Sequence, residues 1–175
     1  MNKISIIFPY LPKYDVDFIH ELQNSNPDLF INIYADMSSN DLFREDSSLS
    51  SLKITHTKIY KFGPVWLMPG LFKILQNSEA NEIVIFNANP RDLSQFLLMI
   101  FARIFRLKII GWGMFHRIGG PRFYSTLYYK LVSIICQRVF VYGEMGRSNL
   151  LRLGVNENKI YKIGNAIKYP KSKPT

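Results

Sequence analysis

A glycine-rich segment that carries a histidine and two arginines is the part of the sequence best suited to chemistry. Four of the ten glycines in the chain fall within ten residues. They are Gly111, Gly113, Gly119 and Gly120. Glycines let a backbone turn tightly and approach a ligand. His116 lies among them, with Arg117 and Arg122 nearby. A histidine there can take a proton from a hydroxyl group, and an arginine can hold a phosphate with two hydrogen bonds. We therefore predict that His116 is catalytic and that the segment binds a ligand; a structural histidine is the alternative.

Two other polar turns are candidates for the same site. Asn87 and Asn89 follow an apolar run, where their amides are suited to hydrogen-bonding hydroxyl groups, and helix capping by Asn89 is the competing interpretation. The second turn holds four candidates, namely Tyr142, Gly143, Glu144 and Arg147. Its acidic and basic residues lie three positions apart at the expected start of a helix, so an ion pair or a helix cap competes with a binding role.

Several common kinds of site have no support in the sequence. It has no Gly-x-Ser-x-Gly elbow, no Walker loop and no Gly-x-Gly-x-x-Gly after the first expected strand, which argues against a serine nucleophile, ATP and NAD. His20, His56 and His116 are far apart in the sequence and lack clustered carboxylates, so we predict no metal and no cofactor. Cys136 is the single cysteine and lies in an apolar run, where we expect a buried, inert thiol.

Apolar runs that alternate with helical patterns must position these turns. The expected strands are short and nearly continuous in apolar residues: Ile4–Phe8, Leu29–Ala35, Leu52–Tyr60, Glu82–Phe86, Leu107–Trp112, Arg138–Tyr142 and Lys159–Ile163. The expected helices are Asp15–Gln23, Val65–Leu75, Asp92–Phe105, Phe123–Cys136 and Glu144–Leu153. The second of these helices is interrupted or restarted at Pro69-Gly70.

This order of strands and helices predicts an α/β fold with a single Rossmann-like, doubly wound parallel sheet. We assign residues 1–167 to that one domain and residues 168–175, rich in lysine and proline, to a linker that is cut short. Ligands of open parallel sheets bind beyond the carboxyl ends of the strands. Three turns are expected at that edge, Pro9–Tyr14, Asn87–Arg91 and Gly111–Gly120.

Charge is distributed very unevenly along the chain. Residues 1–90 hold 7 basic and 10 acidic residues, whereas residues 91–175 hold 15 basic and 3 acidic ones. A basic face of this kind favours an anionic partner, such as a membrane surface or a phosphorylated sugar carrier, although a simply solvated surface is the alternative. Aromatic residues near the basic ones follow helical spacing and fit a core, so we predict no binding of nucleic acid.

The sequence has no run of about 20 apolar residues, so we expect no membrane span. The nearest candidate, Phe96–Ile110, carries Arg103, Arg106 and Lys108. It is explained by a buried crossover helix and its strand, or by a helix that lies in a membrane interface with these basic side chains reaching the headgroups. The N-terminal apolar run is too short for a signal peptide. We therefore expect a cytoplasmic protein, and the interfacial helix leaves peripheral association with the inner face of the cell membrane as an open alternative.

The last third of the chain carries a family resemblance. Tyr142-Gly143-Glu144 opens an expected helix that ends in Leu153-Gly154-Val155, and a short strand then leads to Asn165-Ala166-Ile167. This order resembles the end of the N-terminal domain of family-4 glycosyltransferases of the GT-B fold. Ile109–Arg117 is similar to the strand of that family that runs into a glycine- and histidine-containing turn. The family places a functional histidine there, which aligns with His116 or, in another register, with Met114.

The resemblance implies one half of an enzyme that transfers a sugar from a nucleotide-sugar to a polysaccharide or lipid-linked oligosaccharide. The intact enzyme would transfer the sugar with retention of its anomeric configuration and without a metal. This chain would supply the acceptor side, and it would be inactive until a C-terminal donor domain binds the nucleotide-sugar. Phe8–Pro12 departs from the family because it lacks glycine after the first strand. The alternative is a non-catalytic, membrane-associated subunit that recruits a separate catalytic glycosyltransferase.

Overall fold

The centre of the protein is a seven-stranded sheet whose neighbouring strands all run parallel, in the order β3-β2-β1-β6-β7-β8-β9. The computed structural model describes residues 2–11, 13–38, 52–77, 82–117 and 122–163. The seven strands are β1 (Asn2–Phe8), β2 (Leu29–Ala35), β3 (Lys53–His56), β6 (Ile83–Asn87), β7 (Lys108–Gly113), β8 (Arg138–Val141) and β9 (Ile160–Lys162). The predicted Rossmann-like parallel sheet is confirmed.

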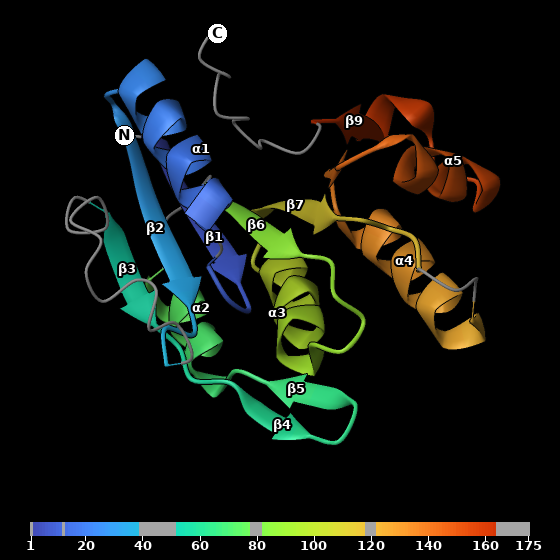
Figure 1. The fold of residues 1–175 in the computed structure, drawn as a ribbon, viewed down its shortest axis with the longest axis horizontal. Coiled ribbons are helices and arrows are strands. Elements are labelled where there is room, and N and C mark those ends of the chain that lie inside the picture. Colours follow the sequence, from blue (N-terminus) through green and yellow to red (C-terminus); the bar gives the residue numbers. More distant parts are fainter. Residues whose placement is uncertain (1, 12, 39–51, 78–81, 118–121, 164–175) are drawn as a thin grey trace, which may run out of the picture.

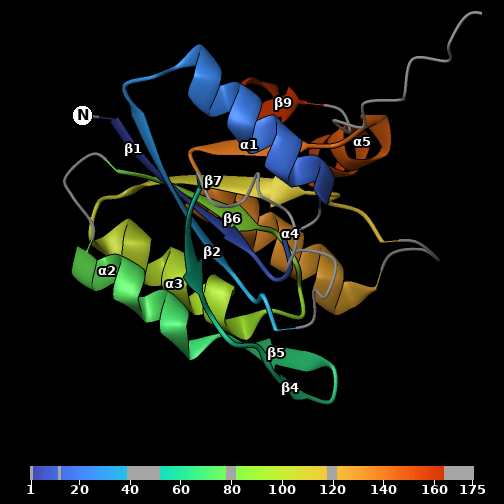
Figure 2. The ribbon, with the colours of Figure 1, turned by 60° about the vertical axis from the view of Figure 1, so that its left-hand side comes forward.

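Helices cover both faces of this sheet (Figures 1 and 2). They are α1 (Lys13–Ser25), α2 (Lys73–Asn77), α3 (Leu93–Ile104), α4 (Phe123–Ile135) and α5 (Glu144–Arg152). Alternate residues of β1 enter two separate cores: Ile6 packs with Val16 of α1, and Ile7 packs in the cluster that contains Leu98 of α3. Because both faces are covered, every side chain of the central strands can be apolar.

The order of the strands fixes where the chain reverses direction across the sheet. From β1 the chain moves outward to β2 and β3, and it then returns to β6 on the other side of β1 before continuing to β9. The gap between the carboxyl ends of β1 and β6 is therefore the topological switch point, where ligands of open α/β sheets bind. Pro9 follows β1 and Asn87 ends β6, so two of the three turns predicted for the ligand edge flank this point.

The region from residue 52 to residue 77 differs from its prediction. We predicted one strand over Leu52–Tyr60 and a helix over Val65–Leu75 that is interrupted or restarts at Pro69-Gly70. A strand and helical turns are present, but the strand is shorter and helical structure begins only at Pro69. β3 ends at His56, and an antiparallel hairpin of β4 (Tyr60–Phe62) and β5 (Val65–Leu67) follows. A 3₁₀ turn, Pro69–Phe72, leads into α2.

Contacts remote in sequence and one turn residue explain the hairpin. Gly63 has φ of +57°, a conformation that glycine adopts without strain and that suits a tight hairpin turn. The Trp66 N–H donates to the carbonyl oxygen of Arg91 at 2.7 Å, which ties β5 to the turn before α3. Pro69 then starts the 3₁₀ turn, because proline has no N–H to continue a helix from upstream.

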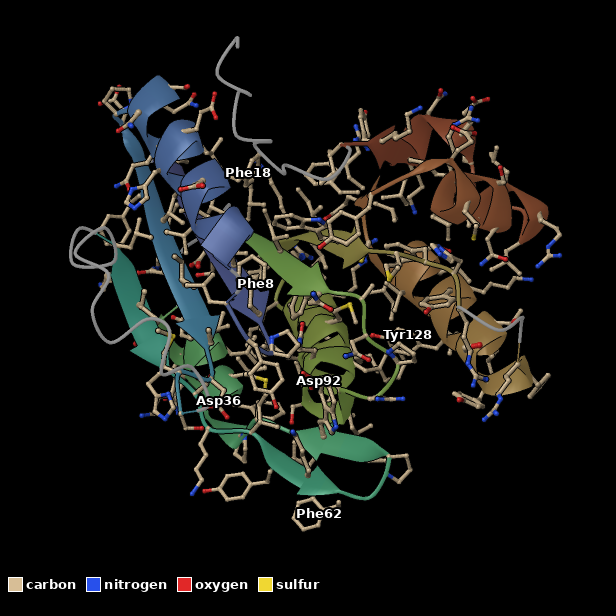
Figure 3. The ribbon with its side chains drawn as sticks, in the orientation of Figure 1. Phe8, Phe18, Asp36, Phe62, Asp92 and Tyr128 are labelled. Carbon is tan, nitrogen blue, oxygen red and sulfur yellow. The ribbon has the colours of Figure 1, made fainter. Side chains whose placement is uncertain are left out.

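Asp36 anchors the segment that follows β2, and the residue is 3% exposed. It accepts hydrogen bonds from the Ser38 N–H at 2.8 Å, the Ser38 hydroxyl at 2.6 Å and the Ile59 N–H at 2.7 Å. Figure 3 shows Asp36 at the carboxyl end of β2, beside the segment that leads to β4. Burial alone would raise the pKa of Asp36, but the bonds from Ser38 and Ile59 outweigh burial and lower it.

We expect Asp36→Asn to lower the free energy of unfolding by about 2 kcal/mol, since an amide cannot accept all three charge-assisted bonds. A depressed pKa stabilises the fold above the unfolded value of about 4, and that contribution disappears as the pH falls through the lower folded value. The difference between wild type and variant should thus be constant near neutral pH and shrink below about pH 4. Urea unfolding measures it, with the exposed Asp17→Asn as the control.

Candidate functional site

The turn after β6 is held by a buried polar pair at the start of α3. Asp92 caps the helix: its Oδ1 accepts from the Gln95 N–H at 3.0 Å, and its Oδ2 accepts from the Gln95 side-chain amide at 2.8 Å. Gln95 in turn accepts from the Asn87 N–H at 2.9 Å. Figure 3 shows Asp92 at the start of α3, between the sheet and the hairpin. Burial raises the pKa of Asp92 despite these bonds.

Asn87 and Asn89 therefore sit on a rigid turn beside the switch point. Asn89 does not cap α3; its side-chain oxygen accepts from the Arg91 N–H at 3.1 Å. The Ala88 N–H donates to the Trp112 carbonyl oxygen at 2.7 Å, which joins this turn to the end of β7. Both asparagines remain candidates for hydrogen bonds to a ligand.

Gly111 and Gly113 let parts of the protein approach β7 closely. A Cβ at Gly111 would lie 3.2 Å from the Cys136 sulfur and 3.3 Å from a Val132 methyl group. A Cβ at Gly113 would lie 3.3 Å from the Ala88 side chain. Both glycines are buried, so the geometry assigns them a packing role beneath the turns. Gly119 and Gly120 lie outside the described residues.

The segment after β7 presents His116 at the carboxyl edge in one fixed orientation. Its Nδ1 lies 2.8 Å from the carbonyl oxygen of Met114. A carbonyl only accepts, so Nδ1 carries the proton in the neutral ring and Nε2 has the lone pair. The Tyr129 hydroxyl donates to the His116 carbonyl oxygen at 3.3 Å. His116 is half-buried, which leaves its ring accessible at the edge.

A cavity of about 290 Å³ lies between this segment and helices α4 and α5. It is lined by His116, Arg117, Ser125, Thr126, Tyr129, Met145, Ser148, Asn149 and Arg152. The Nη1 atom of Arg117 is buried and has no hydrogen-bond partner within the part of the chain that the structure describes. Arg152 also lines the cavity and no acidic side chain is among its lining residues, so the cavity favours an anion. Arg122, by contrast, is exposed at the start of α4.

Sequence reasoning found two of these nine lining residues, His116 and Arg117. The other seven lie on helices whose sequences read as ordinary amphipathic patterns. The Asn149 side chain donates to the carbonyl oxygen of Phe115 at 2.6 Å, and it thereby fixes the backbone next to His116. Phe115 has φ of +51° and is fully buried, so the backbone turns sharply there. Only the three-dimensional packing of α5 reveals the role of Asn149.

The turn after β8 contains the ion pair considered in the sequence. Arg147 donates to Glu144 at 3.0 Å and also pairs with Glu157, and Lys162 lies 3.5 Å from Glu144. The hydrogen bond from Arg147 is the main reason that the pKa of Glu144 is lowered. These groups are substantially exposed, and such pairs stabilise a fold only weakly. Tyr142 packs its ring against Trp112 at 6.1 Å between ring centres, and Gly143 precedes α5.

Gly146 was missed by sequence reasoning although a signal was present. A Cβ at this position would overlap the carbonyl oxygen of Met114, the group that holds His116. Glycine inside a helix costs about 1 kcal/mol relative to alanine, so an internal glycine often marks a close approach. Here the approach brings α5 against the segment that carries His116.

The remaining predictions about titratable groups concern Cys136 and metals. The Cys136 thiol is buried, and burial raises its pKa to about 12, as expected for an inert thiol. Among the described residues, no three histidine, cysteine or carboxylate side chains gather as metal ligands would. None of the described helices has the length and apolar character that crossing a bilayer requires.

The fold is similar to that of several solved UDP-GlcNAc 2-epimerases. The Neisseria meningitidis enzyme, solved with UDP-GlcNAc bound, aligns with a TM-score of 0.64 at 18% identity, over 93% of this chain and 46% of that chain. The Methanocaldococcus jannaschii enzyme aligns with a TM-score of 0.58 at 20% identity, over 93% and 45%. The Rickettsia bellii enzyme aligns with a TM-score of 0.62 at 13% identity, over 95% and 45%.

These likenesses concern the fold alone, because the identities are low. They support the Rossmann-like architecture of the chain. The chain spans less than half the length of these enzymes. No protein-family model and no curated protein matches the sequence.

We expect Gly146→Ala to lower the free energy of unfolding by about 1–3 kcal/mol, because the new methyl group overlaps the Met114 carbonyl. The His116 ring should move with that carbonyl, so its NMR signals should shift. Gly143→Ala is the matched control, since a Cβ there meets no atom within 4 Å and the backbone is extended. Equal stability and unchanged His116 signals in both variants would contradict the packing described here.

Proposed function

We propose that this chain is the acceptor-binding half of a glycosyltransferase that transfers a sugar from a nucleotide-sugar to a polysaccharide or a lipid-linked oligosaccharide. The observation that carries the proposal is the orientation of His116 at the carboxyl edge. Its Nδ1 is tied to the Met114 carbonyl, so Nε2 has the lone pair at the edge where the fold binds ligands. We propose that this arrangement corresponds to the turn of the family-4 glycosyltransferases that carries a functional histidine.

The chemistry that suits this geometry is the binding and activation of a hydroxyl group. As the acceptor oxygen bonds to the anomeric carbon of the sugar, it loses its proton and the nucleotide diphosphate leaves. Nε2 of His116 can accept the hydroxyl hydrogen bond and take that proton. Arg117 and Arg152 in the adjacent cavity can hold a phosphate of a lipid-linked acceptor. Asn87 and Asn89 lie at the end of β6, one strand closer to β1 than β7, and can bind sugar hydroxyl groups.

A second lobe is needed to complete the site. Met114 and Met145 are 45% and 67% exposed at the edge that carries His116, and apolar groups there suit a surface that meets another body. The similar epimerases are more than twice as long as this chain, and one of them was solved with UDP-GlcNAc bound. We propose that a donor domain, in the same polypeptide or in a partner, binds the nucleotide-sugar across this edge.

Two other functions have a specific observation in their favour. The likeness to solved UDP-GlcNAc 2-epimerases favours a chain that is half of a nucleotide-sugar epimerase, an enzyme that needs no acceptor. The exposed methionines also fit a non-catalytic, membrane-associated subunit that recruits a separate catalytic glycosyltransferase. The orientation of His116 favours the acceptor half over the recruiting subunit, because a recruiting subunit has no use for a fixed base.

We expect His116→Ala to lower kcat by about 100-fold or more in the enzyme completed by its donor domain. The reason is the loss of the group that accepts the hydroxyl proton. Transfer of label from a panel of nucleotide-sugars to extracted polysaccharide and lipid-linked acceptors measures this effect. The control is His20→Ala, whose histidine lies on α1, away from the cavity and the turns of the candidate site.

Each alternative gives a distinct result in the same assay. Conversion of UDP-GlcNAc to its epimer without any acceptor would favour the epimerase. Unchanged transfer by His116→Ala, in an assay that still requires this chain, would favour the recruiting subunit. Transfer by this chain without a donor domain would contradict its assignment as the acceptor half.

A further inference from the structure

The outer surface of helices α3 and α4 is apolar where a solvent-facing helix is usually polar. The residues that define this α3–α4 apolar face are Leu97, Ile100, Ile104, Phe123, Leu127 and Ile134. In each helix they recur at spacings that place them on one side. Ile104 is 68% exposed, Ile134 is 65% exposed and Phe123 is 85% exposed, so this side does not belong to the core.

The two apolar stripes adjoin and form one surface. Helices α3 and α4 contact each other, and the rings of Phe96 and Tyr128 pack at 5.6 Å between their centres. Leu98 and Val132 point from the opposite sides of these helices into the core beneath the sheet. Figures 1 and 2 show both helices on the same face of the sheet. The helices are therefore apolar toward the core and apolar again toward the outside.

The charges around this surface identify the kind of partner that it fits. Arg103, Arg106, Arg122 and Lys130 are exposed on the two helices or at their ends. From residue 91 to residue 143 the sequence contains one acidic residue, Asp92, and its side chain is 1% exposed. A second copy of this chain would bring the same positive charges face to face, which opposes self-association. An anionic lipid bilayer offers both an apolar interior and negative headgroups.

We propose that the α3–α4 apolar face docks on the surface of an anionic bilayer. The apolar side chains enter the boundary between headgroups and acyl chains, and the four basic side chains reach the phosphates. The described helices are too short to span a bilayer, so the protein lies on the membrane through this face. This selects the interfacial interpretation that the sequence had left open for Phe96–Ile110.

Docking in this way brings the candidate site close to the headgroups. α4 begins at Phe123 and carries Tyr129, whose hydroxyl donates to the His116 carbonyl oxygen. The same helix thus contributes to the docking face and to the wall of the cavity. The inference deepens the proposed function, because a lipid-linked acceptor would reach His116 without leaving the membrane. Its test requires no sugar transfer and can therefore fail or succeed independently of that proposal.

The test is binding of the purified chain to vesicles. We expect co-sedimentation with vesicles of phosphatidylglycerol and phosphatidylcholine, and much weaker binding to phosphatidylcholine alone or at high salt. The double variant Ile104→Ser/Ile134→Ser should bind about tenfold or more weakly, because two exposed apolar side chains no longer enter the bilayer. Arg103→Glu/Lys130→Glu should remove the preference for anionic vesicles.

A matched control separates docking from a general loss of apolar surface. Phe62 is 62% exposed on the β4–β5 hairpin, away from α4, as Figure 3 shows. Phe62→Ser should bind vesicles as tightly as the wild type, and circular dichroism should show all variants folded. The proposal is overturned if the wild type does not bind anionic vesicles, or if the isoleucine variant binds them equally well. It is also overturned if the wild type forms a dimer that does not bind vesicles and the isoleucine substitutions abolish that dimer.

Discussion

The pairing of β1 with both β2 and β6 is the contact on which the rest of the structure depends. Ile6 and Ile7 are each 1% exposed, yet they enter different cores on opposite faces of the sheet. Parallel strands can be joined only by crossovers, and crossovers of one hand place helices according to the direction of travel. Travel outward to β2 places α1 on one face, and travel from β6 to β9 places α3, α4 and α5 on the opposite face, where α2 also packs. The switch point and the ligand edge follow from this one reversal.

That edge is held by close backbone contacts as well as by buried polar side chains. The turn after β6 is tied to β7 through Ala88, and α5 presses Gly146 against the Met114 carbonyl. The Asn149 side chain then fixes the next residue, Phe115. The base that we propose at His116 must be positioned before it can act, so these contacts to the backbone are part of the same proposal. The groups that orient His116 are the Met114 carbonyl, Gly146 and the Asn149 side chain, and none of them is proposed to react.

The uneven charge along the sequence acquires a spatial meaning in the fold. The acidic half of the chain forms β1 to β3 with α1, and the basic half forms β7 to β9 with α4 and α5. Arg103, Arg122 and Lys130 therefore gather around the outer side of two neighbouring helices. The same half supplies Arg117 and Arg152 to the cavity. Most of the basic residues and the candidate site thus belong to the same half of the chain.

The sequence by itself determined the parallel sheet, the position of His116 after β7 and the inert character of Cys136. These depend on local patterns: apolar runs of strand length, helical spacing, and a thiol within an apolar run. Only the tertiary structure decided the β4–β5 hairpin, the packing role of Gly111 and the cavity between α4 and α5. Each of these depends on contacts between residues far apart in the chain, such as Trp66 with Arg91, or Gly111 with Cys136. A local pattern contains no information about which distant residues will be in contact, so only the folded structure shows that Gly146 of α5 contacts the Met114 carbonyl.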